Sequence, residues 1–362
     1  MKNKVEKVLF VGLGGVGQRH LRNLKAIKGE SVGIFAYRKR NSQFVLNNKL
    51  EIMDNEELNV KYGITCVASL EEAFALGVNT VFICNPTSMH MEILIEALKA
   101  GCNIFVEKPV SANLNGFEEA EGWLKKKKNI TFVGYQNRYH PCIKKAKELL
   151  DRKAIGDIVS VHSEIGECVK NWHKYEDYRT MYACRKELGG GVIVTQIHEL
   201  DYLYYLFGTP KTVYAIGGKL SDLEIDVEDV ADILMGYELG GKYVPVSVHE
   251  DYIQAPARRE CRIVGTEGKI EFDLLSSSFV MFDGTGGIQY SETYEFERND
   301  MFMSELKEFI DCIEKNRNPS ISLPEGKKSL EMAMAVKESI KTGVPIEFGK
   351  FAECGKKGMV LI

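Results

Sequence analysis

The stretch that decides the fold is Val8–Gly17, which reads VLFVGLGGVG and lies close to the start of the chain. An apolar run of strand length passes directly into a G-x-G-x-x-G pattern, and a helix-forming stretch begins near Gln18. Glycines in this pattern permit a tight turn, let the backbone approach a pyrophosphate, and allow the helix to pack closely on the strand. The helix N-terminus adds N–H donors and the positive end of a dipole. The pattern therefore predicts a dinucleotide site formed by Gly12, Gly14, Gly15, Val16 and Gly17.

From Val8 to about Gly134, short apolar runs alternate with helical stretches, which is typical of βαβ units on a parallel sheet. Ser69 and Glu72 form a capping box that opens one helix, and an apolar stripe marks another helix that ends at Gly101. Residues 1–135 are therefore predicted to form a dinucleotide-binding Rossmann domain. Its strands are expected at 8–11, 32–36, 80–84, 103–106 and 131–133.

The pattern changes after Tyr135. Strand-length segments separated by glycine-rich turns fill 212–296, which predicts a second, largely antiparallel sheet. A mostly apolar stretch is long enough for one helix over 192–207, and further helices are expected at 141–150, 301–315 and 324–341. The predicted fold class is α/β, with an N-terminal Rossmann domain followed by an α+β domain over 136–362 with a large open sheet.

Composition excludes several classes of protein. The 362 residues carry 47 Lys+Arg against 51 Asp+Glu, so no basic surplus is available to neutralise nucleic-acid phosphates. No apolar run approaches the roughly 20 residues that cross a bilayer, and the N-terminus lacks a signal-peptide pattern. Nine cysteines are scattered without C-x-x-C or clustered His/Cys spacing, which indicates reduced, mostly buried thiols and no metal site. We expect a cytoplasmic protein that binds neither nucleic acid nor membrane.

The end of the second strand indicates which dinucleotide is bound. An acidic residue there bonds the ribose 2′-hydroxyl of NAD, whereas arginine accommodates the 2′-phosphate of NADP. The chain reads Ala36-Tyr37-Arg38-Lys39-Arg40, without a carboxylate. We therefore expect NADP(H) to be preferred and NAD(H) to be possible, with Tyr37, Arg38 and Arg40 at the adenosine end. The alternative is a solvated basic turn.

Several motifs along the chain occur together: Gly12–Gly17 followed by Arg19-His20, Asn85-Pro86-Thr87 with His90, Glu107-Lys108-Pro109, Gly189-Gly190-Gly191 with His198-Glu199-Leu200-Asp201, and the Gly265–Gly268 turn. This combination resembles the Gfo/Idh/MocA oxidoreductases, the glucose-fructose oxidoreductase and inositol dehydrogenase family. The resemblance implies a Rossmann domain and a second domain whose open sheet has substrate on one face and often a partner subunit on the other. A homodimer or homotetramer is expected from it. It adds to the cofactor site Asn85, Pro86, Thr87, His90, Glu107 and Lys108.

The resemblance also implies that Lys108 and His198 surround the reacting carbinol beside the nicotinamide. A desolvated lysine just past the carboxyl end of a parallel strand can exchange a proton with an alcohol. His198 and Asp201 are three apart on a predicted helix, so Asp201 can hold the tautomer of His198 or support the helix. The family commonly places Asp one turn before this His, but here Thr195 stands nearest, with the spacing short by one. As the third catalytic candidate, Thr195 can hydrogen-bond a hydroxyl but cannot act as a base at neutral pH. Either Lys108 and His198 suffice for proton transfer, or the net activity is altered.

The segment Asn171–Arg179 is dense in aromatic and hydrogen-bonding side chains. Aromatic rings suit the apolar faces of a sugar, and Arg179 can fork onto a carboxylate or phosphate; a packing loop is the alternative. The run resembles a subgroup of the family associated with sialic-acid-like sugars. Predicted substrate contacts are Tyr135, Asn137, Arg138, Trp172, His173, Tyr178, Arg179 and Asp201.

The leading functional prediction is hydride transfer between the dinucleotide and a secondary alcohol of a sugar or sugar-acid derivative, with Lys108 and His198 handling the proton. A second hypothesis keeps the cofactor tightly bound and uses transient oxidation for net elimination or hydration of a sugar. A third is a dinucleotide-binding sensor without catalysis, for which Thr195 is the one positive sign.

Overall fold

A computed structural model describes residues 4–39 and 42–356 of the chain. Its contacts divide the chain into two compact units, which are described separately. The first unit comprises Met1–Tyr135, His173–Asp177 and Phe302–Lys327, and the second comprises Gln136–Trp172, Tyr178–Met301 and Lys328–Ile362. The predicted boundary after Tyr135 assigns His173–Asp177 and Phe302–Lys327 to the second domain. The contacts of these two segments place them in the first unit.

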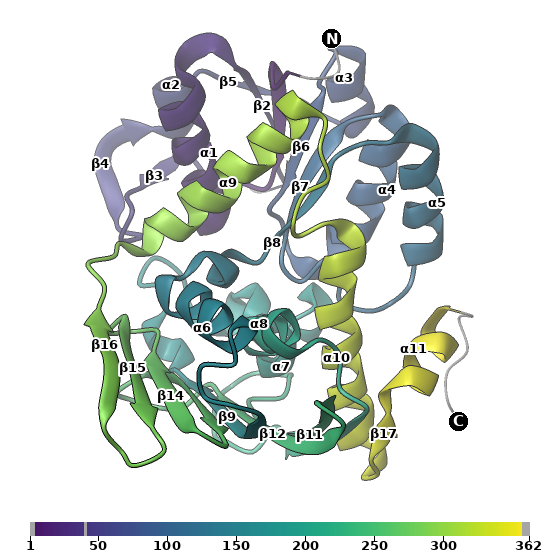
Figure 1. The fold of residues 1–362 in the computed structure, drawn as a ribbon. Coiled ribbons are helices and arrows are strands. Elements are labelled where there is room, and N and C mark those ends of the chain that lie inside the picture. Colours follow the sequence, from purple (N-terminus) through teal and green to yellow (C-terminus); the bar gives the residue numbers. More distant parts are fainter. Residues whose placement is uncertain (1–3, 40–41, 357–362) are drawn as a thin grey trace. The chain divides into compact units, whose positions relative to one another are not determined.

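The first unit contains the predicted Rossmann sheet. Six strands are paired in the order β5-β2-β1-β6-β7-β8, and each pair is parallel. The sheet is shown in Figure 1, and its strands are β1 (Lys7–Val11), β2 (Gly33–Tyr37), β5 (Ile64–Cys66), β6 (Thr80–Ile83), β7 (Asn103–Glu107) and β8 (Thr131–Gly134). β6, β7 and β8 carry buried side chains at every position, as expected for a sheet that is covered on both faces.

Helices cover both faces of this sheet (Figure 1). On one face, Phe309 packs its ring against Phe82, Phe105 and Phe132, one from each of three neighbouring strands. Phe309 belongs to a helix far along the chain, so the core of the first unit is closed by a C-terminal segment. The helices of this unit are α1 (Gly15–Lys28), α2 (Leu58–Tyr62), α3 (Leu70–Ala75), α4 (His90–Ala100), α5 (Phe117–Lys127) and the greater part of α9 (Arg298–Lys315).

A two-stranded hairpin follows β2 and was not expected from the sequence. It consists of β3 (Phe44–Leu46) and β4 (Ile52–Glu57). β4 is largely exposed and polar, so it lacks the apolar alternation that marks a strand in sequence. The hairpin is fixed to α1, where Gln18 donates to the Phe44 carbonyl and accepts from the Leu46 N–H.

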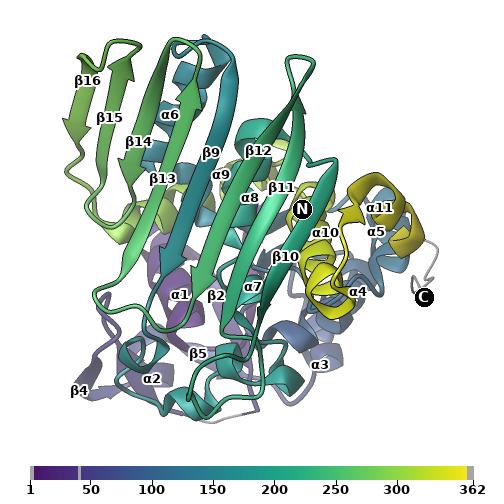
Figure 2. The ribbon, with the colours of Figure 1, turned by 90° about the horizontal axis from the view of Figure 1, so that it is seen from below.

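The second unit is built on a nine-stranded sheet with the order β16-β15-β14-β13-β9-β12-β11-β10-β17. Only the β9–β12 pair is parallel among the described pairs, which confirms the large, mainly antiparallel sheet. Figure 2 shows it face-on, with helices behind it. The strands are β9 (Ile158–Gly166), β10 (Thr212–Gly218), β11 (Val230–Leu239), β12 (Lys242–Asp251), β13 (Arg258–Gly265), β14 (Gly268–Asp273), β15 (Ser278–Asp283), β16 (Ile288–Thr293) and β17 (Ile346–Glu347).

The helix predicted over 192–207 is wrong in one respect, because it is split. The structure has α7 (Val192–Thr195) and α8 (His198–Phe207), with Gln196 between them at φ −88° and ψ 15°. Four consecutive β-branched residues form α7, and such side chains lose rotamer freedom in a helix. The break makes His198 the first residue of α8. The other helices are α6 (Pro141–Asp151), α10 (Leu323–Thr342), which spans both units, and α11 (Phe348–Lys356).

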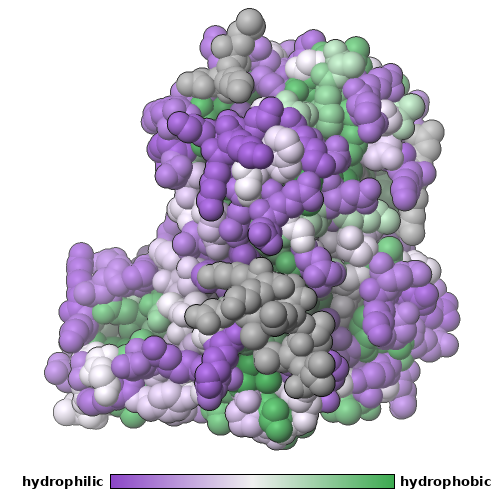
Figure 3. Space-filling view, turned by 90° about the vertical axis from the view of Figure 1, so that its right-hand side faces the viewer, coloured by the Kyte–Doolittle hydropathy of each residue, from purple (hydrophilic) through white to green (hydrophobic). Residues whose placement is uncertain are grey.

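Within the described part of the chain, no helix is long and apolar enough to cross a membrane. On the face shown in Figure 3, hydrophilic side chains predominate and the hydrophobic patches between them are small. The eight cysteines from Cys66 to Cys312 are free thiols, and of these only Cys66 is exposed. Burial raises the pKa of the Cys84 thiol well above its ordinary value, and the nearby carboxylates of Glu107 and Glu305 add to the effect. Cys84 is therefore a packed thiol.

Candidate active site

The turn between β1 and α1 has the geometry of a phosphate-binding loop. A Cβ on Gly12 would lie 2.8 Å from the backbone of Asn85, and one on Gly17 would lie 2.3 Å from the Gly12 carbonyl oxygen. These two positions therefore have no room for a side chain. Gly14, by contrast, has no atom within 4 Å of its Cβ position. The middle glycine is open where a pyrophosphate would approach the backbone, so the residues present fit a dinucleotide.

Further predicted residues gather at the same edge of the first sheet. Asn85 follows β6, and Lys108 follows β7, the next strand along. His90 links the two loops, because its Nδ1 lies 2.9 Å from the Pro109 carbonyl oxygen and its Nε2 lies 2.7 Å from that of Asn85. Burial lowers the pKa of His90, against the effect of these hydrogen bonds and of Glu107. His90 thus connects the loops at the edge where the half-buried Lys108 lies.

At the predicted adenosine end, Arg38 already has partners within the protein. Its guanidinium donates to the Ser42 carbonyl oxygen at 3.0 Å and to Asn59 Oδ1 at 2.9 Å. Tyr37 is half-buried at the end of β2, whereas Arg40 lies outside the described residues. No carboxylate stands in the Ala36–Arg40 segment, and the preference for NADP(H) stays a prediction.

Behind Lys108 lies a buried cluster of His20, Glu107 and Glu305. His20 Nε2 is 2.6 Å from Glu107 Oε1, and the Lys108 N–H donates to the other oxygen of Glu107 at 3.3 Å. Glu305 is fully buried, and neither of its oxygens has a hydrogen-bond partner among the described residues. Burial raises the pKa of Glu305 well above its ordinary value, and the charge of Glu107 raises it further.

The three side chains place one possible ligand atom each within 4.8 Å of one another. However, two ligands of a tetrahedral metal ion are about 3.3 Å apart, and the 2.6 Å between His20 and Glu107 is shorter than that. The geometry fits a hydrogen-bonded pair of His20 and Glu107 beside a buried Glu305 carboxyl whose pKa is raised.

In the second unit, two of the three glycines that precede His198, Gly190 and Gly191, have no room for a side chain. Gly191 has φ +118°, and a Cβ there would lie 2.2 Å from Glu228 Oε1. A Cβ on Gly190 would lie 2.4 Å from the Tyr182 carbonyl oxygen. The glycines therefore let the chain pass close to these groups before α7 begins.

His198 is buried and is held by a residue that the sequence interpretation missed. Gln136 Nε2 lies 3.0 Å from His198 Nε2, in a hydrogen bond whose direction depends on the imidazole tautomer and the amide orientation. Gln136 directly follows Tyr135 and precedes two predicted substrate contacts, but only the fold reveals that it faces His198. Thr195 is also buried and interacts with the Tyr252 hydroxyl.

The two acids of the His198–Asp201 motif anchor α8. Asp201 accepts hydrogen bonds from Arg138 at 2.7 and 2.9 Å and from Ser329 at 2.7 Å. Glu199 accepts two from Arg259, at 2.8 and 2.9 Å. Both acids are fully buried. Asp201 therefore supports the helix, one of the two roles considered for it.

The other predicted substrate residues are spread over both units. Tyr135 is fully buried and donates to the Gly326 carbonyl oxygen, and His173 stacks on Tyr175 in the first unit. In the second unit, Asn137 is buried, Trp172 packs edge-on against Tyr252, and Arg179 pairs with Glu224. The Tyr178 hydroxyl accepts from the Glu224 N–H. Because Lys108 and His198 also belong to different units, their meeting at one substrate stays a prediction.

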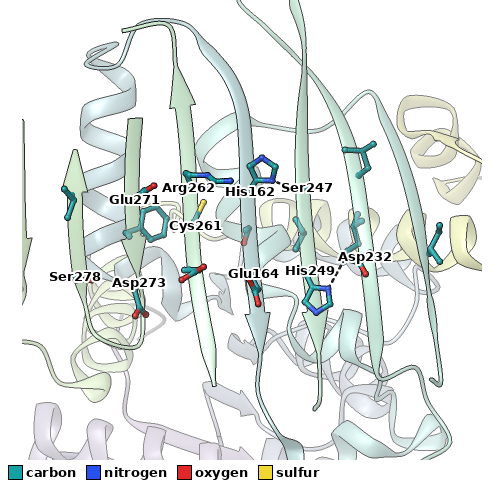
Figure 4. A pocket seen from close by; sticks show the side chains of 18 of the residues that line it. His162, Glu164, Asp232, Ser247, His249, Cys261, Arg262, Glu271, Asp273 and Ser278 are labelled. Carbon is teal, nitrogen blue, oxygen red and sulfur yellow. Dashed lines mark hydrogen bonds and ion pairs between the residues drawn. The ribbon is translucent and has the colours of Figure 1, made fainter. Parts of the chain in front are cut away.

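A pocket of about 880 Å³ lies on the open face of the nine-stranded sheet (Figure 4). None of the predicted catalytic or cofactor residues lines it. His249 lies in it, 2.9 Å from Asp232 and 3.1 Å from Asp251. Burial acts to lower the pKa of His249, but the two aspartates outweigh it and the pKa is raised. This pocket is a hollow on a sheet face, lined by both polar and apolar side chains.

Comparisons with known proteins agree with this architecture. Residues 6–135 match the model of the oxidoreductase family, NAD-binding Rossmann fold, and residues 147–348 match that of the C-terminal alpha/beta domain of the same family. Myo-inositol 2-dehydrogenase of Thermotoga maritima is 27% identical over 346 residues, which cover 92% of this chain and 96% of that protein. The 2,7-anhydro-N-acetylneuraminate hydratase of Escherichia coli is 30% identical over 148 residues, covering 40% of this chain and 38% of that protein.

Among solved structures, an oxidoreductase from Agrobacterium radiobacter in complex with NAD+, L-tartaric acid and magnesium has a TM-score of 0.77. It is 19% identical, and the match covers 96% of this chain and 99% of that one, so it shows the fold alone. Two family models together span most of the sequence, in the order in which the structure places the two folds. The chain is an enzyme of the Gfo/Idh/MocA family of oxidoreductases, with an NAD-binding Rossmann fold.

Proposed function

We propose that this enzyme transfers a hydride between a nicotinamide dinucleotide and a secondary alcohol of a sugar or sugar-acid derivative. The observation that carries the proposal is the carboxyl edge of the first sheet, where the open turn at Gly14 and the half-buried Lys108 follow strands separated only by β6. The similarity to an inositol dehydrogenase and to a hydratase of a sialic-acid derivative supports a polyhydroxylated substrate.

Lys108 is proposed to take the proton of the alcohol during oxidation and to return it during reduction. The bound nicotinamide supplies the hydride chemistry, so the protein has to move one proton and to orient the carbinol. His198, held by Gln136, is proposed as the second group on the carbinol oxygen. The buried anchors of α8 fix the position of His198, which limits the motion of its ring.

We propose that NADP(H) is preferred over NAD(H), because arginine and not a carboxylate follows Tyr37. Arg38 would have to exchange its contact with Ser42 or Asn59 for one with a 2′-phosphate. A calorimetric titration with NADPH and NADH tests this preference directly. Equal affinity for the two would contradict it.

A second reaction is favoured by one observation, the similarity of the chain to the hydratase. In this reaction, oxidation of the sugar acidifies a neighbouring C–H bond, elimination or hydration follows, and the hydride returns to the sugar. No net change in cofactor results. The sensor hypothesis receives no such support, and membership of an enzyme family goes against it.

The two reactions are separated by one experiment. The purified enzyme with its dinucleotide is incubated with sugar acids, inositols and nucleotide sugars, while nicotinamide absorbance and product mass are followed together. An absorbance change with a two-hydrogen mass change is the expected result for a dehydrogenase. A changed sugar without a net cofactor change would support transient oxidation, and a panel that stays unchanged in both measurements would contradict the proposed substrate class.

The oligomeric state and the location of the enzyme in the cell are two further proposals. Exposed apolar side chains, among them Ile216 and Leu234, stand on the open face of the large sheet. We propose that a second copy of the chain covers this face in a homodimer or homotetramer. Free and mostly buried thiols support a cytoplasmic location.

A further inference from the structure

A side chain from far along the sequence lies on the glycine-rich turn. A Cβ on Gly15 would be 2.8 Å from the hydroxyl of Tyr175, which belongs to the short segment His173–Asp177 of the first unit. The same Cβ would be 3.2 Å from Leu50 Cδ2. Gly15 is the first residue of α1, so both side chains lie at the helix terminus that is expected to receive a pyrophosphate.

Leu50 lies in the loop that connects β3 and β4. Asn47 organises that loop, since its side-chain oxygen accepts from the N–H groups of Lys49 and Glu51. Leu50 itself has φ 61°, a left-handed conformation that is costly for a leucine and that the surrounding structure must hold.

The hairpin is fastened to α1 immediately beyond the glycines. Arg19 donates to the Asn48 carbonyl oxygen at 2.9 Å, and Arg22 donates to those of Leu46 at 2.6 Å and Asn47 at 3.3 Å. Figure 1 shows β3 and β4 beside this helix. Leu50 is therefore held over the turn by several contacts.

Tyr175 is held by its own neighbours. Its ring stacks on His173 at 5.1 Å between centroids and lies 6.0 Å from the ring of Phe44 in β3. His173 Nδ1 is in turn 2.7 Å from Glu176 Oε1. The phenol thus has a defined position, with its one O–H donor beside the first N–H groups of α1.

We propose that Tyr175 is a dinucleotide-binding residue whose hydroxyl donates to the pyrophosphate, and that Tyr175 and Leu50 together hold the dinucleotide on the glycine-rich turn between catalytic cycles. The inference rests on the proposed function, because it assumes a dinucleotide at this turn. A charged phosphate is a strong acceptor, so one such hydrogen bond slows dissociation substantially. Slow release is what a reaction needs when the hydride is returned to the same sugar.

The test is the dissociation rate of bound NADPH and NADH, measured by stopped-flow fluorescence after mixing with excess competitor. We expect Tyr175→Phe, which removes only the hydroxyl, to raise the dissociation rate about tenfold. Leu50→Ala should raise it as well, without loss of a hydrogen bond. The matched control is Tyr243→Phe, a change at an exposed tyrosine of β12, which should leave the rate at the wild-type value.

The outcomes separate the inference from the proposed function. Wild-type rates in both Tyr175→Phe and Leu50→Ala, with dinucleotide still bound, would overturn the inference and leave the proposed function intact. A wild-type enzyme that binds neither dinucleotide would overturn both. Hydrogen exchange gives a second readout, since amides of 44–51 and 173–177 should exchange more slowly once dinucleotide is added, and unchanged exchange in both segments would contradict the proposed contact.

Discussion

At the scale of single residues, Glu305 is a buried acid whose carboxyl oxygens accept no hydrogen bond from the described residues. It is fully buried and lies beside the carboxylate of Glu107. Burial and the negative charge of Glu107 both disfavour the ionised form, so the pKa of this carboxyl is raised well above its ordinary value. Glu107, by contrast, has partners: its Oε1 lies 2.6 Å from His20 Nε2, and its Oε2 accepts from the Lys108 N–H at 3.3 Å.

This assignment predicts a pH-dependent stability. The pKa of Glu305 is raised in the folded state, so its contribution to stability is complete below the unfolded-state pKa and is lost as pH rises toward the folded-state pKa. Glu305→Gln removes this loss. The stability of the variant relative to the wild type should rise by about 1.4 kcal/mol per pH unit between roughly pH 4.3 and the folded-state pKa of Glu305.

Urea unfolding between pH 5 and pH 8 measures the effect. Glu92→Gln, at an exposed position of α4, is the matched control and should keep the wild-type pH dependence. A constant difference between Glu305→Gln and the wild type over this range would contradict the assignment.

Residue types were easier to predict than residue partners. The sequence located the glycine-rich turn and Lys108, since each depends on a local pattern next to a strand. Gln136 and His198 are 62 residues apart, and Arg259 and Glu199 are 60 apart, so only the fold pairs them. For the same reason, Arg138 and Asp201 were both expected to face substrate, whereas the structure pairs them with each other.

At the scale of elements, α8 is the part of the second unit on which His198 depends. Asp201 and Glu199 attach its first turn to Arg138, Ser329 and Arg259, which lie on other segments of the chain. Local signals predicted its end at Gly208 and most of the strands. They missed the break before His198 and the hairpin β3–β4, because both depend on tertiary contacts that outweigh local preference.

Removal of Asp201, one of the two acids that anchor α8, should therefore lower the free energy of unfolding. Asp201→Ala removes the carboxylate that pairs with the buried guanidinium of Arg138, and we expect a loss of about 3–5 kcal/mol in the free energy of unfolding. Asp151→Ala, at an exposed surface ion pair of α6, should cost less than about 1 kcal/mol. Chemical unfolding of both variants checks this, and similar losses in the two would show that the buried pair does not anchor the helix.

At the scale of the whole molecule, the open face of the nine-stranded sheet bears on assembly. Leu234 on β11 is 52% exposed and lines the pocket on that face. If a second copy covers the face, a charge at this position is buried without a partner in the assembly while the single chain tolerates it.

Leu234→Glu should accordingly lower the molar mass in solution from that of an oligomer to that of one 40.8 kDa chain. Val60→Glu, at a 76% exposed position of α2, should leave the mass unchanged. Light scattering coupled to size-exclusion chromatography measures both. An unchanged oligomer in Leu234→Glu would place the interface elsewhere on the chain.

The most direct measurement compares turnover with dinucleotide binding in Lys108→Met, using a substrate identified from the sugar panel. Removal of the amine should reduce kcat at least a thousandfold while the dinucleotide Kd stays within a few-fold of the wild-type value, because the glycine-rich turn is unchanged. Lys127→Met, at an exposed position near the end of α5, should leave both quantities at wild-type values. Near-normal turnover in Lys108→Met would contradict the role of Lys108 in proton transfer.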